Sequence, residues 1–127
     1  MTASLPPLII YPATLPLVIL RNSTFRKRFV VNVGGDPVDL TVSGTVIDAD
    51  IKNAAGTQIG TFTAVLPEIS NVPVPGTFDL ELTPSASLAL PIAKDHKWDV
   101  SITYPDGDRF YYCKGPLEVC DTQSRNS

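Results

Sequence analysis

His96 is the only histidine of the chain, and it lies in the charged segment KDHKWD between Asp95 and Asp99. A histidine beside a carboxylate can act as a general base, because its ordinary pKa lies near neutral pH. No serine or cysteine nucleophile motif accompanies it in the sequence. We therefore expect His96 to be an exposed loop residue without a catalytic role.

Two pairs of aspartates have spacings that also occur in functional sites. Asp48 and Asp50 share one face of a predicted strand, ~7 Å apart, a separation that suits the two carboxylates of a glycosidase. Asp106 and Asp108 flank a glycine, as in part of a calcium loop, but the remaining ligands of such a loop are missing. We expect a solvated strand face and a hairpin turn, so the sequence predicts neither an enzyme nor a bound metal or cofactor.

Cys113 and Cys120 are the two cysteines. On one extended strand they would be ~23 Å apart, too far to bridge, whereas a chain reversal at 114–116 would let them approach. We expect two thiols that do not pair, as in a protein made in a reducing compartment. Two cysteines and one histidine also fall short of a closed zinc site.

A basic cluster, Arg21, Arg26, Lys27 and Arg28, stands out because the net charge is −3 and the pI about 4.9. The acidic balance gives no electrostatic reason to bind nucleic acid. The cluster has two interpretations. It protects an edge strand from unwanted pairing, or it docks onto an acidic neighbour.

The apolar residues recur in short alternating runs that end at Gly, Pro or Asp. Phe78, Leu80 and Leu82 alternate with acidic residues, and Trp98 begins a similar run, a period of two that is typical of half-buried strands. Several such strands in a row predict an all-β fold, a single antiparallel β-sandwich. The predicted strands are 15–21, 24–32, 45–52, 57–66, 77–83, 97–104 and 109–114, the last continued past Gly115-Pro116 by 117–120. A short edge segment is expected at 38–41, a loop at 67–76 and a helical turn capped by Thr83.

The aromatic group of the last hairpin is Tyr104, Phe110, Tyr111 and Tyr112. An aromatic patch can hold sugar rings, but alternating aromatics on a hairpin more often belong to the core and to cross-strand pairs. We expect core positions for most of them.

Three segments follow from this pattern: a proline-rich extended N-terminal arm at 1–14, the β-sandwich domain at 15–120 and a polar tail at 121–127. Prolines in the arm prevent a helix. Its apolar residues must pack on the same domain or on a neighbouring protein, which makes them candidate interaction residues: Leu5, Leu8, Ile9, Ile10 and Tyr11. The apolar stretch at 5–20 is interrupted by four prolines and does not predict a membrane helix.

The order of the segments STFRKRFVVN, GGDPVDLTVSGTVIDADIK, GTFDLELTPSASLAL and KWDVSITYPDGDRFYYCKGPLEV resembles the small β-sandwich domains of tailed-bacteriophage tail and baseplate proteins. The resemblance spans roughly residues 15–120. The shared motifs fall at 23–25, 35–41, 49–52, 76–82, 83–90, 98–100 and 106–119.

This resemblance implies an immunoglobulin-like sandwich and a non-enzymatic structural subunit of a virion, at the tail or baseplate. Such a subunit is synthesised in the bacterial host cytoplasm, contacts other virion proteins and forms a homo-oligomer in the particle. The arm and the arginines Arg21, Arg26 and Arg28 would form its protein contacts. Two alternatives stay open: a capsid decoration (cement) protein, and a carbohydrate-binding module for host-surface glycan.

Overall fold

The computed structural model describes residues 13–33 and 35–121, and it is mostly β-structure. The arm residues Leu5, Leu8, Ile9, Ile10 and Tyr11 lie outside the described residues. The all-β fold class predicted from the alternating runs is therefore confirmed for the part of the chain that the structure describes.

One sheet of six strands has the order β1-β13-β12-β6-β7, with β2 also paired to β13. β12 and β13 form the long hairpin at its centre, turning at 105–108 as predicted. The bounds are β1 Ala13–Thr14, β2 Leu17–Leu20, β6 Val46–Lys52, β7 Gln58–Thr61, β12 Ala93–Thr103 and β13 Arg109–Cys120.

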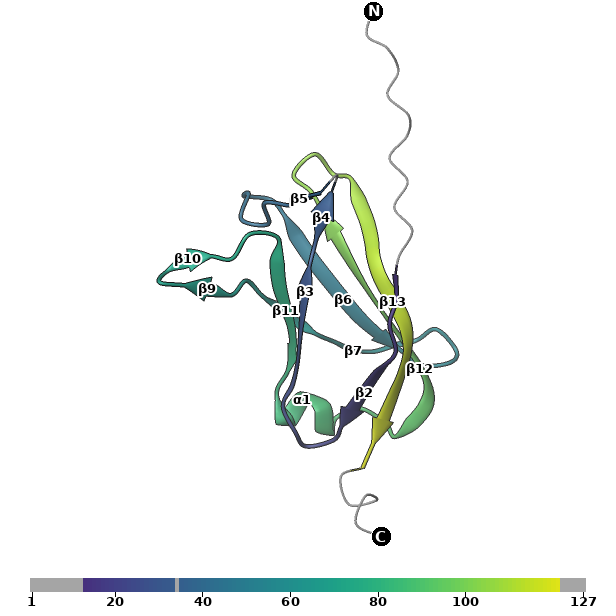
Figure 1. Ribbon diagram of the computed structural model, residues 1–127. Coiled ribbons are helices and arrows are strands. Elements are labelled where there is room, and N and C mark those ends of the chain that lie inside the picture. Colours follow the sequence, from purple (N-terminus) through teal and green to yellow (C-terminus); the bar gives the residue numbers. More distant parts are fainter. Residues whose placement is uncertain (1–12, 34, 122–127) are drawn as a thin grey trace, which may run out of the picture.

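A second sheet of three strands has the order β3-β11-β8, and small hairpins extend from it (Figure 1). Its strands are β3 Phe25–Val30, β8 Thr63–Val65 and β11 Thr77–Leu82. The hairpins are β4 Asn32–Val33 with β5 Asp36–Pro37, and β9 Glu68–Ile69 with β10 Val72–Pro73.

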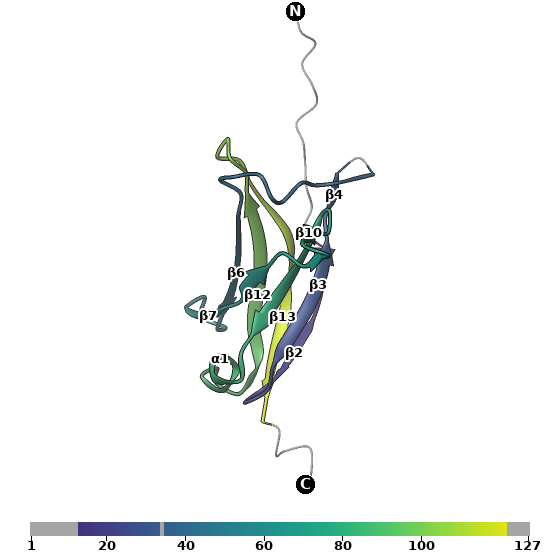
Figure 2. The ribbon, with the colours of Figure 1, turned by 90° about the vertical axis from the view of Figure 1, so that its left-hand side faces the viewer.

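The two sheets face each other across a common apolar core (Figure 2). Trp98 of β12 is 2% exposed, as expected, and it packs against Phe29 of β3 and Phe62, with ring centroids 5.8 and 6.2 Å away. These aromatic contacts join one sheet to the other. Helix α1, Pro84–Leu88, carries the chain from β11 to β12, with the Thr83 hydroxyl accepting a hydrogen bond from the Ala86 N–H. This confirms the predicted cap and crossing.

The N-terminal strand differs from the prediction. The segment 15–21 was expected to be one strand of an antiparallel sandwich, but the extended chain is interrupted at Leu15-Pro16, and both β1 and β2 run parallel to β13. Proline has no N–H to continue a ladder, which accounts for the break.

Three other expectations about elements were wrong. The strand at 57–66 divides at Phe62, whose burial in the core lets β7 join the large sheet and β8 the small one. The loop at 67–76 contains the hairpin β9–β10, whose turn residues Ser70 and Asn71 both have positive φ, as in a type I′ turn. The segment 38–41 is not a strand, because the Asp39 carboxylate accepts hydrogen bonds from Thr41 and closes a local turn.

Candidate interaction surface

The arginines of β3 face acidic residues of β11 on the outer side of the small sheet. The strand register sets Arg28 opposite Asp79 and Arg26 opposite Glu81. Arg28 donates through Nε and Nη2 to the two carboxylate oxygens of Asp79, at 2.8 and 3.1 Å. The Arg26 Nε lies 2.7 Å from Glu81 Oε2. Each arginine is thus paired within its own sheet.

Asp79 is the most buried member of these pairs, at 5% exposure. The hydrogen bonds from Arg28 lower the pKa of the Asp79 carboxyl below its usual range, against the opposing effect of burial. Since Arg28 itself stays largely exposed, the pair covers the carboxylate while the guanidinium faces solvent.

Arg21 has a different partner. Its guanidinium donates to the carbonyl of Leu88 at the end of α1, at 2.9 and 3.3 Å, while Ser23 and Ser87 exchange hydrogen bonds nearby. Cationic side chains commonly satisfy the free carbonyls at helix ends. The arginines of the basic cluster are therefore distributed over two intramolecular structures, and their role in docking stays a prediction.

The amino-acid sequence by itself does not pair these arginines with their acidic partners. The signal that was available is the matching spacing of two, in Arg26 and Arg28 and in Asp79 and Glu81, on two strands of opposite direction. Assigning it required the register, which only the fold supplies.

The other side of β3 is an open edge. Among the described strands, β3 pairs with β11 alone. The Val31 N–H donates to the Gly76 carbonyl on the β11 side, at 2.7 Å. Because hydrogen-bonded positions alternate along an antiparallel ladder, the backbone groups of Arg28 and Val30 point away from β11, to the open edge.

An apolar cleft of about 210 Å³ lies beside this edge, between β3 and the strands β1 and β13. It is smaller than typical small-molecule sites of roughly 300–1,000 Å³, so its size suits individual side chains. Its lining consists of Ala13, Phe29, Val30, Val31, Asn32, Phe78, Val100, Tyr112 and Cys113. Burial raises the pKa of the Cys113 thiol, which keeps it protonated and a poor nucleophile.

A larger groove of about 680 Å³ lies on the six-stranded sheet, and half of its ten lining residues are charged, although most of its exposed lining is apolar. Lys52, Lys97 and Lys114 line it with Asp95 and Asp99. Lys52 Nζ lies 3.9 Å from Asp99 Oδ2, and burial raises the pKa of the Asp99 carboxyl. The groove presents charges of both signs.

His96 is not the exposed loop residue that the sequence predicted. β12 starts at Ala93, so His96 lies within the strand at 4% exposure. Its Nε2–H donates to the Pro91 carbonyl at 2.9 Å, and Nδ1 has no hydrogen-bond partner among the described residues. The error arose from the flanking charges, which face outward while His96 follows the inward period of Trp98 and Val100. Since neither ring nitrogen contacts a carboxylate, the geometry lacks an acid–base pair at this residue.

The aspartate pairs lie where the sequence placed them. Asp48 and Asp50 are on β6, and Asp50 lies opposite Asp99 of β12. Asp106 accepts a hydrogen bond from the Asp108 N–H within the hairpin turn. No group of three or more metal-ligating side chains gathers among the residues that the structure describes.

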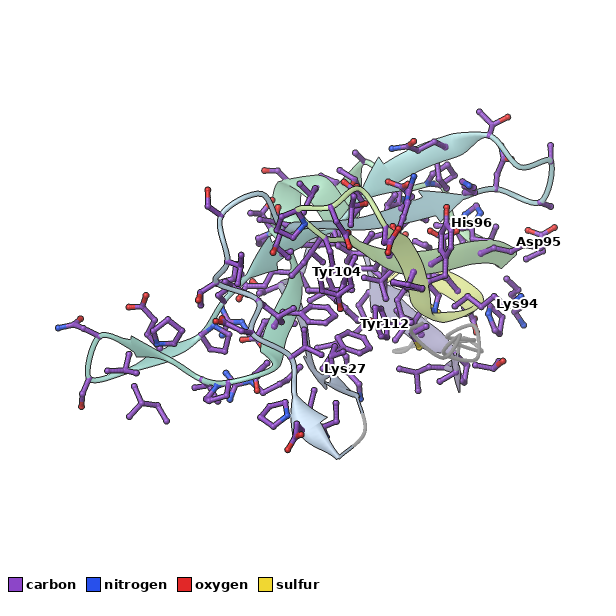
Figure 3. All side chains as sticks on the ribbon, turned by 90° about the horizontal axis from the view of Figure 1, so that it is seen from above. Lys27, Lys94, Asp95, His96, Tyr104 and Tyr112 are labelled. Carbon is purple, nitrogen blue, oxygen red and sulfur yellow. The ribbon has the colours of Figure 1, made fainter. Side chains whose placement is uncertain are left out.

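Most of the hairpin aromatics are partly buried. The hydroxyl oxygens of Tyr104 and Tyr112 lie 2.6 Å apart, and the ring of Phe110 lies 6.0 Å from that of Tyr104. Figure 3 shows both tyrosines near the middle of the molecule seen from above, whereas Lys94 and Asp95 lie at the periphery. Burial raises the pKa of Tyr104. Tyr111 is the exposed member, beneath the guanidinium of Arg109.

Cys113 and Cys120 both lie on β13, and no disulfide joins them. The strand is continuous through 114–116, so the chain reversal that would have brought the sulfurs together does not occur. The Cys120 thiol donates to the Glu118 carboxylate at 3.2 Å.

Comparison with protein-family models gives no match to this sequence, and no curated protein matches it either. Within the described ranges, the one helix falls well short of the length and apolar character needed to cross a bilayer.

Proposed function

We propose that the protein is a non-enzymatic structural subunit of a tailed-phage virion, at the tail or baseplate, and that it acts by protein–protein assembly. The observation that carries this proposal is the open edge of β3 beside an apolar cleft whose lining includes Ala13, where the described chain begins. The apolar segment that precedes Ala13 needs a surface on which to bury its side chains. An unpaired strand edge offers one.

The fold of this subunit is an immunoglobulin-like sandwich. Three features of its strand pairing support this assignment: β3, β11 and β8 form one sheet, β6, β12 and β13 belong to the other, and the chain crosses between them as in immunoglobulin domains. Trp98 departs from the antibody pattern, since it lies on the penultimate strand β12 rather than on the third strand. In both positions the tryptophan side chain packs between the two sheets.

The enzyme alternative has weaker support than assembly. The ring of His96 is buried and held by a backbone carbonyl, so it is poorly placed to exchange a proton with a substrate. Because His96 is buried, the variant that replaces His96, Asp48 and Asp50 together by neutral residues is first shown by circular dichroism to be folded. Such a folded triple variant should be incorporated into particles normally. Hydrolysis of host glycans by the native protein that disappears in the folded triple variant would contradict the proposal.

The direct test is to locate the protein in purified phage. Particles from a host expressing the epitope-tagged chain are separated into tails and DNA-filled heads, and each fraction is examined by mass spectrometry and cryo-electron microscopy. Presence in tails supports the proposal, and presence on heads supports the cement alternative. If intact particles lack the protein while it accumulates in the cell, the virion role is wrong.

A further inference from the structure

We propose that the open edge of β3 and its cleft bind the segment Leu8–Tyr11 of a second copy of this chain as an added strand. This inference deepens the assembly role proposed above and rests on it, because it names the partner and the surface. Peptides that extend a sheet gain affinity from backbone hydrogen bonds and specificity from pockets that take alternate side chains.

The C-terminal half of β3 has both features of such a site, an unpaired backbone edge and a side-chain pocket. The backbone of Arg28 and Val30 points to the open edge, and Val30 is 61% exposed. The cleft beside Val30 and Asn32 is open to an added strand, and its lining is mostly apolar. At about 210 Å³ it exceeds the ~150 Å³ of an engineered apolar cavity that accepts benzene, so it has room for an aliphatic side chain.

The N-terminal half of β3 is protected from pairing with an added strand. Lys27 lies on the same face as Phe25 and Phe29, yet it is exposed. A lysine on the inward face of an edge strand deters pairing by a foreign strand. The site is therefore short, extending from Arg28 towards Asn32.

The segment of the arm that fits is equally short. Leu8-Ile9-Ile10-Tyr11 is the only run of four consecutive apolar residues before Ala13 without proline, and Pro7 and Pro12 bound it. Each of its four residues has the N–H that a ladder requires, and proline cannot continue the ladder on either side. The segment is therefore about as long as the unprotected part of the β3 edge.

The occupant is a second copy because of where the described chain begins. Ala13 lines the same cleft as Val31 and Asn32, at the far end of β3, and β1 runs parallel to β13, into the domain. The residues preceding Ala13 of the same chain would have to reverse direction at once to reach Arg28. The same segment of a neighbouring chain can approach from outside without that reversal.

Mixed-chain cross-linking tests this arrangement. One chain carries Val30→Cys, a second carries a single cysteine at position 8, 9, 10 or 11 in turn, and both carry Cys113→Ala and Cys120→Ser. We expect a short bismaleimide to join the two chains for at least one of the four positions, and a cysteine at Thr2 to give at most a trace. Cross-links formed only within one chain, in a protein that carries both cysteines at high dilution, would show that the arm folds back and would overturn the proposal.

Sedimentation of the chain with its native cysteines gives an independent measurement. Ile10→Asp places a charge in an apolar cleft, so we expect self-association to weaken about tenfold or more, while the matched change Thr2→Asp has little effect. A native chain that is monomeric, or an oligomer that Ile10→Asp leaves unchanged, would contradict the inference. Both measurements use purified protein, so they can succeed even if the phage fractions show no virion role, and the reverse holds.

Discussion

The strands β13 and β3, which border the apolar cleft, differ in what pairs with their edges. β13 is covered along its outer side by β1 and β2, which run parallel to it. β3 faces the cleft from the other sheet and has β11 as its one partner among the described strands. The N-terminal part of the domain thus adds short strands beside β13, whereas β3 stays at the edge of its sheet and borders the cleft, which favours the edge of β3 as the place for assembly.

The covering of β13 by β1 and β2 depends on a close backbone contact at Leu15. Its carbonyl accepts a hydrogen bond from Trp98 Nε1 at 2.8 Å, and its N–H donates to the Lys114 carbonyl at 2.8 Å. Gly115 lies directly under Leu15, where a Cβ would meet the Leu15 backbone. The break at Pro16 and the missing side chain at Gly115 together let the chain lie on β13.

The largest effect is expected at Trp98, which contacts both the N-terminal segment and the small sheet: Leu15 by its hydrogen bond and Phe29 by ring packing. Trp98→Ala should lower the free energy of unfolding by about 3–5 kcal/mol, as for large core aromatics. Denaturant unfolding measures this, with Tyr111→Ala as the exposed aromatic control. A loss below about 1 kcal/mol, the size usual for surface positions, would contradict the packing of Trp98 between the sheets.

Gly115→Ala should break the comparison by loosening β1 and β2 from the edge of β13. The new methyl group cannot fit beneath Leu15 without moving its backbone, and such overpacking typically costs about 1–3 kcal/mol. Relative to the native protein, we expect the substitution to accelerate amide exchange more in β1 and β2 than in β12, as measured by hydrogen–deuterium exchange. Pro116→Ala, exposed on the same strand, is the control. Unchanged exchange in β1 and β2 would show that Leu15 has more freedom than its contacts indicate.

The alternating runs predicted most of the sheet-forming segments because burial on one face imposes a period of two. Trp98 and Leu80 could be assigned in this way, and the helix cap at Thr83 followed from Pro84 after it and Pro91 beyond the turn. The pairing of the edges could not. Whether the chain before Leu17 joins β3 or β13 depends on the crossing at Leu15, which involves residues distant in sequence.

The candidate site shows the same limit. The sequence marked Arg26 and Arg28 by their charge alone, as edge protection or as a docking patch, and their partners on β11 became visible only with the register. The cleft was missed altogether, because its walls come from β1, β3, β11, β12 and β13. No local pattern reports a cavity made by so many separate segments.

The ion pair between Arg28 and Asp79 on the small sheet should make the stability of the domain depend on pH. Asp79 has a folded-state pKa below the unfolded value of about 3.9, so the pair stabilises the domain above about pH 4, and this stabilisation is lost as the pH falls through the folded-state pKa. Arg28→Gln should lower stability at neutral pH, and the difference from the native protein should shrink towards pH 2.

Urea unfolding at several pH values between 2 and 7 measures this. Arg26→Gln is the matched control, because Glu81 is more exposed than Asp79 and the loss of that pair should matter less. A difference between Arg28→Gln and the native protein that is constant over the whole range would show that the arginine acts by packing rather than by charge.

The smallest effect on stability is expected at Val30, and it separates the two edges most directly. Val30 on β3 and Val18 on β2 are similarly exposed, at 61% and 56%, so lysine at either position should change the free energy of unfolding by no more than about 0.5 kcal/mol. Their effects on self-association should differ. Lysine on the strand edge beside the cleft deters strand addition there, so Val30→Lys should weaken the oligomer, while Val18→Lys on β2, which does not line the cleft, should leave it intact. Denaturant unfolding and analytical ultracentrifugation of the two variants measure both quantities. Equal loss of the oligomer in the two variants would mean that contact is spread over both edges, and an oligomer preserved in Val30→Lys would remove the edge of β3 from the interface.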